Sequence, residues 1–141
     1  MKYLYLLLLI GLPLTAQESL PTLDAELHAI TDKVAGVETI GLIFNPKDVA
    51  LEGTPVTLKT LAVPATNGAV LIKNARAIMG RVQVVYLLKG KIVTTPKFAG
   101  FIVKLAKKKG IKVFTNDPGL KDVAGVSLVA VNSAGAFQAA D

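Results

Sequence analysis

The stretch from Val82 to Leu88 (VQVVYLL) is apolar almost throughout. A strand of this kind is typical of the centre of a parallel sheet that is covered by helices on both faces. Strand patterns and helix patterns alternate before and after it, which indicates βα units joined by right-handed crossovers. We therefore expect an α/β fold: a single three-layer, flavodoxin-like domain with a mostly parallel sheet of five strands.

The remaining elements follow from the spacing of apolar residues and from turn and capping residues. The predicted strands cover residues 38–44, 56–63, 82–88, 111–115 and 125–131. The predicted helices cover residues 23–34 and 69–79, the segment from Pro96 to the residues before Gly110, and a last segment that Ser133 caps and that stops at Asp141.

The first sixteen residues resemble a secretory signal peptide in layout. Lys2 precedes an apolar run from Leu4 to Leu12, and small residues follow at Thr15-Ala16. The run is shorter than the roughly 20 residues that a membrane-spanning helix needs, so a retained anchor is the weaker alternative. We expect cleavage after Ala16, export to the periplasm, and one mature domain over residues 17–141.

Composition excludes several classes of protein. Cysteine is absent, which excludes a lipid-modified cysteine, a disulfide framework and thiolate metal sites. The formal net charge is +6, but export and the scarcity of aromatic residues argue against a nucleic-acid partner. Lysines in the last turn before Gly110 complement the helix dipole and are interpreted as a solvated basic face. These are Lys104, Lys107, Lys108 and Lys109.

Nothing in the sequence predicts an enzyme. There is no glycine-rich phosphate loop, no serine in a nucleophile elbow and no close acidic pair in an apolar setting. His28 is the sole histidine, and a single histidine without cysteine is interpreted as a surface residue, not as a metal ligand. We therefore predict no catalytic residues, no metal and no cofactor.

Polar residues follow most of the predicted strands. In an open parallel sheet, ligands bind beyond the carboxyl ends of the strands, so these residues are candidates for binding a zwitterion or a small acid. An anion could also meet the amides at the start of the helix after Thr95. Each candidate has an alternative interpretation as an ordinary turn or capping residue. The candidates are Asn45, Thr94, Thr95, Asn116, Asp117, Asn132 and Ser133.

Three segments resemble the substrate-binding proteins of ABC transporters: Val37–Pro46 (VETIGLIFNP), Arg81–Pro96 (RVQVVYLLKGKIVTTP) and Phe101–Val131. The resemblance implies the C-terminal half of a two-lobed periplasmic-binding-protein fold of type I. It departs from the family in two ways. The opening lobe is missing, and the segment between Pro46 and Val56 is so short that the usual helix there looks eroded.

Two functions follow from the resemblance. The first is a periplasmic solute-binding protein, associated with an ABC transporter, that takes a small polar solute such as an amino acid or an organic anion. A single lobe offers one wall of a pocket, so a homodimer, a membrane transporter or a sensor protein would complete it. The second is a non-catalytic interaction or sensory module that has lost the solute and docks through an apolar patch beside the shortened crossover.

Overall fold

The structure of the chain, a computed structural model, describes residues 18–19, 22–51 and 54–140. The predicted signal peptide, residues 1–16, lies outside the described residues. The strands are β1 (Glu18–Ser19), β2 (Ile40–Phe44), β3 (Val49–Ala50), β4 (Thr60–Pro64), β5 (Val84–Leu87), β6 (Lys112–Thr115), β7 (Val126–Val131) and β8 (Phe137–Ala139). The helices are α2 (Leu23–Lys33), α3 (Gly68–Ile78), α4 (Pro96–Lys109) and the short 3-10 helix η2 (Pro118–Leu120).

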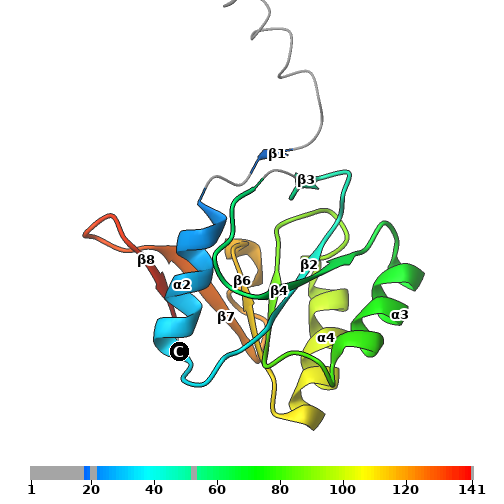
Figure 1. Cartoon of the computed structure of the whole chain (residues 1–141). Coiled ribbons are helices and arrows are strands. Elements are labelled where there is room, and N and C mark those ends of the chain that lie inside the picture. The colour runs from blue at the N-terminus through cyan, green and yellow to red at the C-terminus, as the bar shows by residue number, and fades with distance from the viewer. Residues whose placement is uncertain (1–17, 20–21, 52–53, 141) are drawn as a thin grey trace, which may run out of the picture.

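The main sheet has six strands in the order β4-β2-β5-β6-β7-β8 (Figure 1). The first five pair in parallel, and β8 pairs with β7 in the antiparallel direction. The order of the parallel strands, which reverses between β2 and β5, is that of flavodoxin-like sheets. The α/β class and the mostly parallel sheet are therefore confirmed, with six strands in place of the expected five.

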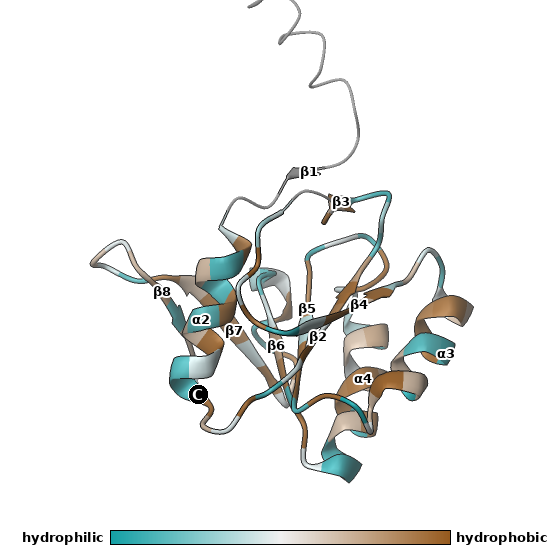
Figure 2. Cartoon of the chain, in the orientation of Figure 1, coloured by the Kyte–Doolittle hydropathy of each residue, from teal (hydrophilic) through white to brown (hydrophobic). Residues whose placement is uncertain are grey.

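Helices α3 and α4 lie together on one face of the sheet (Figure 1). Asn67 caps α3 by accepting a hydrogen bond from the Val70 N–H, and Thr95 caps α4 in the same way from the Phe98 N–H. Hydrophobic residues concentrate on the strands, while the last turn of α4 is hydrophilic (Figure 2). The buried residues of α4 are Ala99, Ile102 and Ala106.

Helix α2 covers the opposite face, beside β7 and β8 (Figure 1). Leu23, Leu27 and Ile30 are fully buried in a hydrophobic cluster that also contains residues of β2, β5 and β6. No helix occurs in the described part of the crossover between β2 and β4, residues 45–51 and 54–59. Its Leu51, Val56 and Leu58 pack onto the same hydrophobic cluster and complete this layer.

The predicted last helix is wrong: residues 132–136 form a turn, and β8 follows. The Asn132 side chain explains the difference, because its Oδ1 accepts hydrogen bonds from the N–H groups of Ala134 and Ala136. Gly135 adopts a positive φ of 82°, which closes the hairpin. Ser133 therefore lies in an exposed turn and caps no helix. The hairpin buries Ala139 in the cluster beneath α2.

None of the helices in residues 22–51 and 54–140 is long and apolar enough to cross a membrane.

Candidate functional site

The carboxyl edge of the sheet carries most of the predicted candidates. Asn45 follows β2, Asn116 and Asp117 follow β6, and the loop after β5 leads to Thr94 and Thr95. The parallel strands bring these loops to one edge, where they bond to one another. Asn116 Oδ1 accepts a hydrogen bond of 2.8 Å from the Lys89 N–H in the loop after β5.

The candidate side chains at this edge stabilise their own loops. The Thr94 hydroxyl donates to the Gly90 carbonyl at 2.8 Å and accepts from the Gly90 N–H at 3.0 Å. Asn45 Oδ1 accepts from the Lys47 N–H at 3.0 Å, and Asp117 Oδ1 accepts from the Gly119 N–H at 2.8 Å. These are turn and capping contacts, which short polar side chains make readily with nearby backbone.

The carboxyl edge is also stabilised by two side chains that the sequence analysis did not single out, Thr115 and Asp48. The buried Thr115 hydroxyl donates to the Leu87 carbonyl at 2.9 Å and accepts from the Asp117 N–H at 3.1 Å. Asp48 Oδ2, in the crossover after β2, accepts from the Lys91 N–H at 3.1 Å. Within the described residues, every buried side-chain oxygen or nitrogen has a hydrogen-bond partner.

Asn132 and Ser133 do not join the other candidates. Thr115 pairs with Leu128, so Asn116 lies level with Val129. Asn132 lies three residues further along, about 10 Å beyond that level at the usual rise of a strand. The β7–β8 hairpin carries both residues away from the remaining loops (Figure 1).

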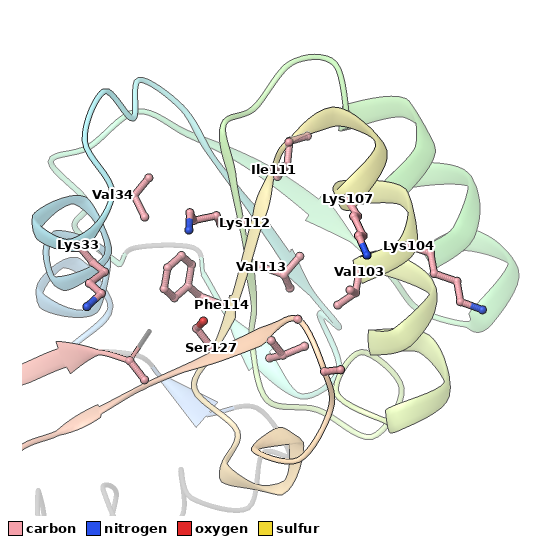
Figure 3. Close-up of a pocket in the computed structure, with 15 residues that line it drawn as sticks. Lys33, Val34, Val103, Lys104, Lys107, Ile111, Lys112, Val113, Phe114 and Ser127 are labelled. Atoms are coloured by element: carbon pink, nitrogen blue, oxygen red, sulfur yellow. The ribbon is translucent and has the colours of Figure 1, made fainter.

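A hollow opens at the opposite, amino edge of the sheet, where β6 and β7 begin (Figure 3). Its volume is about 870 Å³, within the range of small-molecule sites. The C-terminal ends of α2 and α4 flank it. We call it the basic hollow, and it is lined by Lys33, Val34, Val103, Lys104, Lys107, Gly110, Ile111, Lys112, Val113, Phe114, Ala124, Gly125, Val126, Ser127 and Ala140.

The lining of the basic hollow has one sign of charge. Four lysines contribute to it, Lys33, Lys104, Lys107 and Lys112, and none of the described residues that line it is acidic. Lys33 has another interaction of its own. For the other three lysines, no ion pair is found among the residues that the structure describes. Among the described lining residues, positive charge is therefore in excess.

Local sequence explains the shape of the basic hollow. Gly110 ends α4 with a left-handed φ of 70°, which turns the chain directly into β6. Gly125, with a φ of 88°, packs so closely that an added Cβ would lie 2.6 Å from Val103 Cγ1. The loop before β7 thus meets α4 at one wall. Val113 and Phe114 form a buried floor, and Val34, Val103 and Val126 are half-buried around it.

Asp24, His28 and Thr57 form a polar cluster on the surface of α2. Thr57 donates hydrogen bonds to Asp24 Oδ1 from its N–H at 2.8 Å and from its hydroxyl at 2.9 Å. These bonds, chiefly the one from the backbone N–H, lower the pKa of Asp24. His28 Nε2 is the ring atom near both Thr57 and Asp24, so the cluster lacks the relay of a catalytic triad, which needs both ring nitrogens. The hydrogen bonds of this cluster connect the crossover to α2.

A second polar cluster is enclosed beneath α2. The Tyr86 hydroxyl donates to Glu26 Oε1, and the Thr22 hydroxyl donates to Glu26 Oε2 at 2.8 Å. Tyr86 is fully buried and Glu26 is 4% exposed. Burial and, second, the neighbouring Glu26 carboxylate raise the pKa of Tyr86 far above its usual range. The pair is closed to solutes and joins α2 to the central strand.

Metal binding finds no support in the described parts of the chain, where no group of three or more His, Cys, Asp or Glu residues could hold an ion.

Comparison with known proteins identifies a similar fold and no family. No family model and no curated protein matches the sequence. A similar solved structure is the crystal structure of a conserved domain protein from Vibrio cholerae O1 biovar El Tor str. N16961, with 16% sequence identity and a TM-score of 0.62. The similarity covers 82% of this chain and 42% of that one, so this chain spans less than half the length of the Vibrio protein. At this identity the likeness shows the fold alone.

Proposed function

We propose that this chain is an exported, non-catalytic solute-binding module that holds a small organic anion in the basic hollow. Lysines from α4 and β6 line the basic hollow together with apolar residues, and no described lining residue is acidic; this observation carries the proposal. Export and association with a membrane transporter or sensor protein rest on the signal-peptide layout and on the resemblance to ABC-transporter substrate-binding proteins.

The helix dipole does not account for this arrangement. Basic residues in the last turn of a helix offset its negative end, and Lys107, Lys108 and Lys109 all meet that description. Only Lys107 of these three lines the basic hollow, and Lys112 belongs to a strand. The C-terminal ends of α2 and α4 together contribute about one negative charge. The positive charge of Lys104, Lys107 and Lys112 is larger than this.

Magnitudes indicate what kind of anion fits. An exposed ion pair contributes about 0.2–1 kcal/mol, so Lys104, Lys107 and Lys112 together supply at most about 3 kcal/mol. Micromolar binding needs about 8 kcal/mol. Burying about 100 Å² of an apolar ligand adds about 2.5 kcal/mol. We therefore expect organic anions to bind with dissociation constants of about 0.1–1 mM, and inorganic anions more weakly.

The alternative, an interaction module, has less support. The apolar patch expected beside the shortened crossover is not found among the described residues, because the crossover packs its own apolar side chains onto the sheet. Among all the residues that the structure describes, the large hydrophobic residue that is strongly exposed is Val131 in β7, at 56%. A single exposed valine is ordinary for a surface.

The test is a calorimetric and NMR titration of the mature chain with benzoate, octanoate, glutamate and inorganic phosphate. The triple substitution Lys104→Met, Lys107→Met and Lys112→Met should weaken binding of benzoate and octanoate at least about tenfold. The matched control is the triple substitution at Lys108, Lys109 and Lys121, which are exposed and do not line the basic hollow. It removes the same charge and should leave the affinity within about twofold.

Two outcomes would contradict the proposal. If both triple variants weaken binding equally, the anions respond to net charge and not to the basic hollow. If glutamate binds and shifts the resonances of Asn45 and Asn116 instead, the site is the carboxyl edge.

A further inference from the structure

The basic hollow reaches both faces of the sheet. Val113 and Val126 belong to the hydrophobic cluster beneath α3 and α4, whereas Phe114 and Val34 belong to the cluster beneath α2. All four residues line the same hollow. Side chains of neighbouring strand residues point to opposite faces, so the hollow passes around the amino ends of β6 and β7 from one face to the other.

The lysines divide between the two faces in the same way. Lys104 and Lys107 come from α4 and lie on its side of β6 (Figure 3). Lys112 lies two residues from Phe114 and therefore shares the α2 face, as Figure 3 also shows. Lys33, at the end of α2, lies on this side and already has a partner, so Lys112 is the open charge here. The basic hollow thus has two separate positive poles.

Between the poles the lining is mainly apolar. Val113 and Phe114 form its buried floor, and Val126 is half-buried beside them. Ser127 adds a hydroxyl close to Phe114 (Figure 3). A compact dianion such as phosphate, held at one pole, would place both of its charges beside this apolar stretch, where desolvation is unfavourable.

We propose that the basic hollow binds an elongated organic dianion that has an acidic group at each end and an apolar middle, as in an α,ω-dicarboxylate. This inference rests on the proposed function and specifies its ligand. One carboxylate lies near Lys104 and Lys107, the other lies near Lys112, and the hydrocarbon chain crosses the apolar floor. A monocarboxylate of the same length reaches one pole at a time.

The test compares octanedioate with octanoate by calorimetry on the mature chain. Octanedioate should bind more tightly by up to about fivefold, the largest gain expected from a second exposed ion pair of about 0.2–1 kcal/mol. Dimethyl octanedioate, which has the same length and no charge, should show no measurable binding. This comparison of ligands needs no variant, and equal affinities for octanedioate and octanoate would overturn the two-pole inference.

Variants at each pole sharpen the test. Lys112→Met, and separately the pair Lys104→Met with Lys107→Met, should reduce octanedioate affinity to that of octanoate. Octanoate, which can use either pole, should lose less affinity than octanedioate in each variant, because the other pole remains. The pair Lys108→Met with Lys109→Met is the control for charge. Thermal unfolding of each variant shows that it is folded.

The two proposals fail in different ways. If octanoate and octanedioate bind equally and both pole variants weaken them alike, anion binding stands and the dianion does not. If neither acid binds the wild-type chain, the proposed function itself is wrong.

Discussion

The two edges of the sheet use their polar side chains differently. At the carboxyl edge, Asn45, Thr94, Asn116 and Asp117 bond to backbone groups of the loops that carry them or that lie beside them. At the amino edge, Lys104, Lys107 and Lys112 line a hollow and form no ion pair with the described residues. Convergence of polar residues therefore does not by itself make a binding site, since the groups must also be available.

Side-chain length explains the difference. Asn, Asp and Thr hold their polar atoms close to the backbone, so they compete for nearby N–H and C=O groups. Lysine carries its ammonium on a flexible stem of four carbons and keeps it in solvent while the stem covers apolar surface. Lysine side chains thus remain available to a ligand after folding. The side-chain oxygens of asparagine and threonine are instead used in hydrogen bonds within the turns.

The largest effect expected concerns the wall of the basic hollow. Gly125→Ala places a Cβ 2.6 Å from Val103 Cγ1 and puts alanine at a φ of 88°. Left-handed backbone costs about 1–2 kcal/mol and overpacking about 1–3 kcal/mol, so the free energy of unfolding should fall by about 3 kcal/mol in urea denaturation. Gly100→Ala, inside α4, is the control, because its added Cβ meets no heavy atom within 4 Å beyond its chain neighbours and its own helix backbone, and alanine is favoured over glycine in a helix. Equal stabilities for the two variants would show that the wall is not tightly packed.

At the carboxyl edge the expected loss is smaller. Thr115→Val keeps the shape of this fully buried side chain but leaves the Leu87 carbonyl without its donor and the Asp117 N–H without its acceptor. We expect the free energy of unfolding to fall by about 2 kcal/mol and anion affinity to stay unchanged. Ser133→Ala, in the exposed hairpin turn, should change stability by less than about 0.5 kcal/mol. A loss of anion binding in Thr115→Val would erase the distinction between the edges.

Most of the fold could be predicted from local patterns. The spacing of Leu23, Leu27 and Ile30 predicted α2, and Thr95-Pro96 and Gly110 marked both ends of α4. The prediction of a last helix was wrong because the sequence Asn132-Ser133 is compatible with either a helix cap or a turn. The structure of this C-terminal segment depends on its pairing with β7 and on the burial of Ala139 beneath α2. These are tertiary contacts that the local sequence does not contain.

The candidate site was less accessible from sequence. The turn residues were recognised, but whether their oxygens stay available depends on which loops the strand order places side by side. Lys104 and Lys107 had a sufficient local explanation in the helix dipole. Their relation to Lys112 arises because β6 begins directly after α4, while the C-terminal end of α2 lies across the same hollow. The one feature of the sequence that could have indicated this site is Lys112, a lysine at the start of an otherwise apolar strand.

The buried Tyr86–Glu26 pair tests whether enclosed polar groups behave like those of the carboxyl edge. Tyr86→Phe removes a donor to a buried carboxylate, so the free energy of unfolding at pH 7 should fall by about 1.5 kcal/mol, with anion affinity unchanged. The folded state raises the pKa of Tyr86, so its contribution is complete below the unfolded value of about 10 and is lost as pH rises above it. The stability difference between the two proteins should therefore narrow above about pH 10 in urea denaturation. A difference that stays constant to pH 11 would contradict this assignment.

The smallest effect on stability is expected at the lysines themselves. Replacing Lys104 and Lys107 by methionine removes a favourable interaction with the helix dipole, about 0.3–1 kcal/mol for Lys107 in the last turn. It also relieves repulsion within a basic region of a chain whose formal net charge is +6. The two effects oppose each other, so the free energy of unfolding without ligand should change by less than about 0.5 kcal/mol, measured in urea at low and at moderate salt. A loss of about 1 kcal/mol for each lysine would mean that these residues serve the fold as the carboxyl-edge residues do. The α4 side of the basic hollow would then have no charge left over for a ligand.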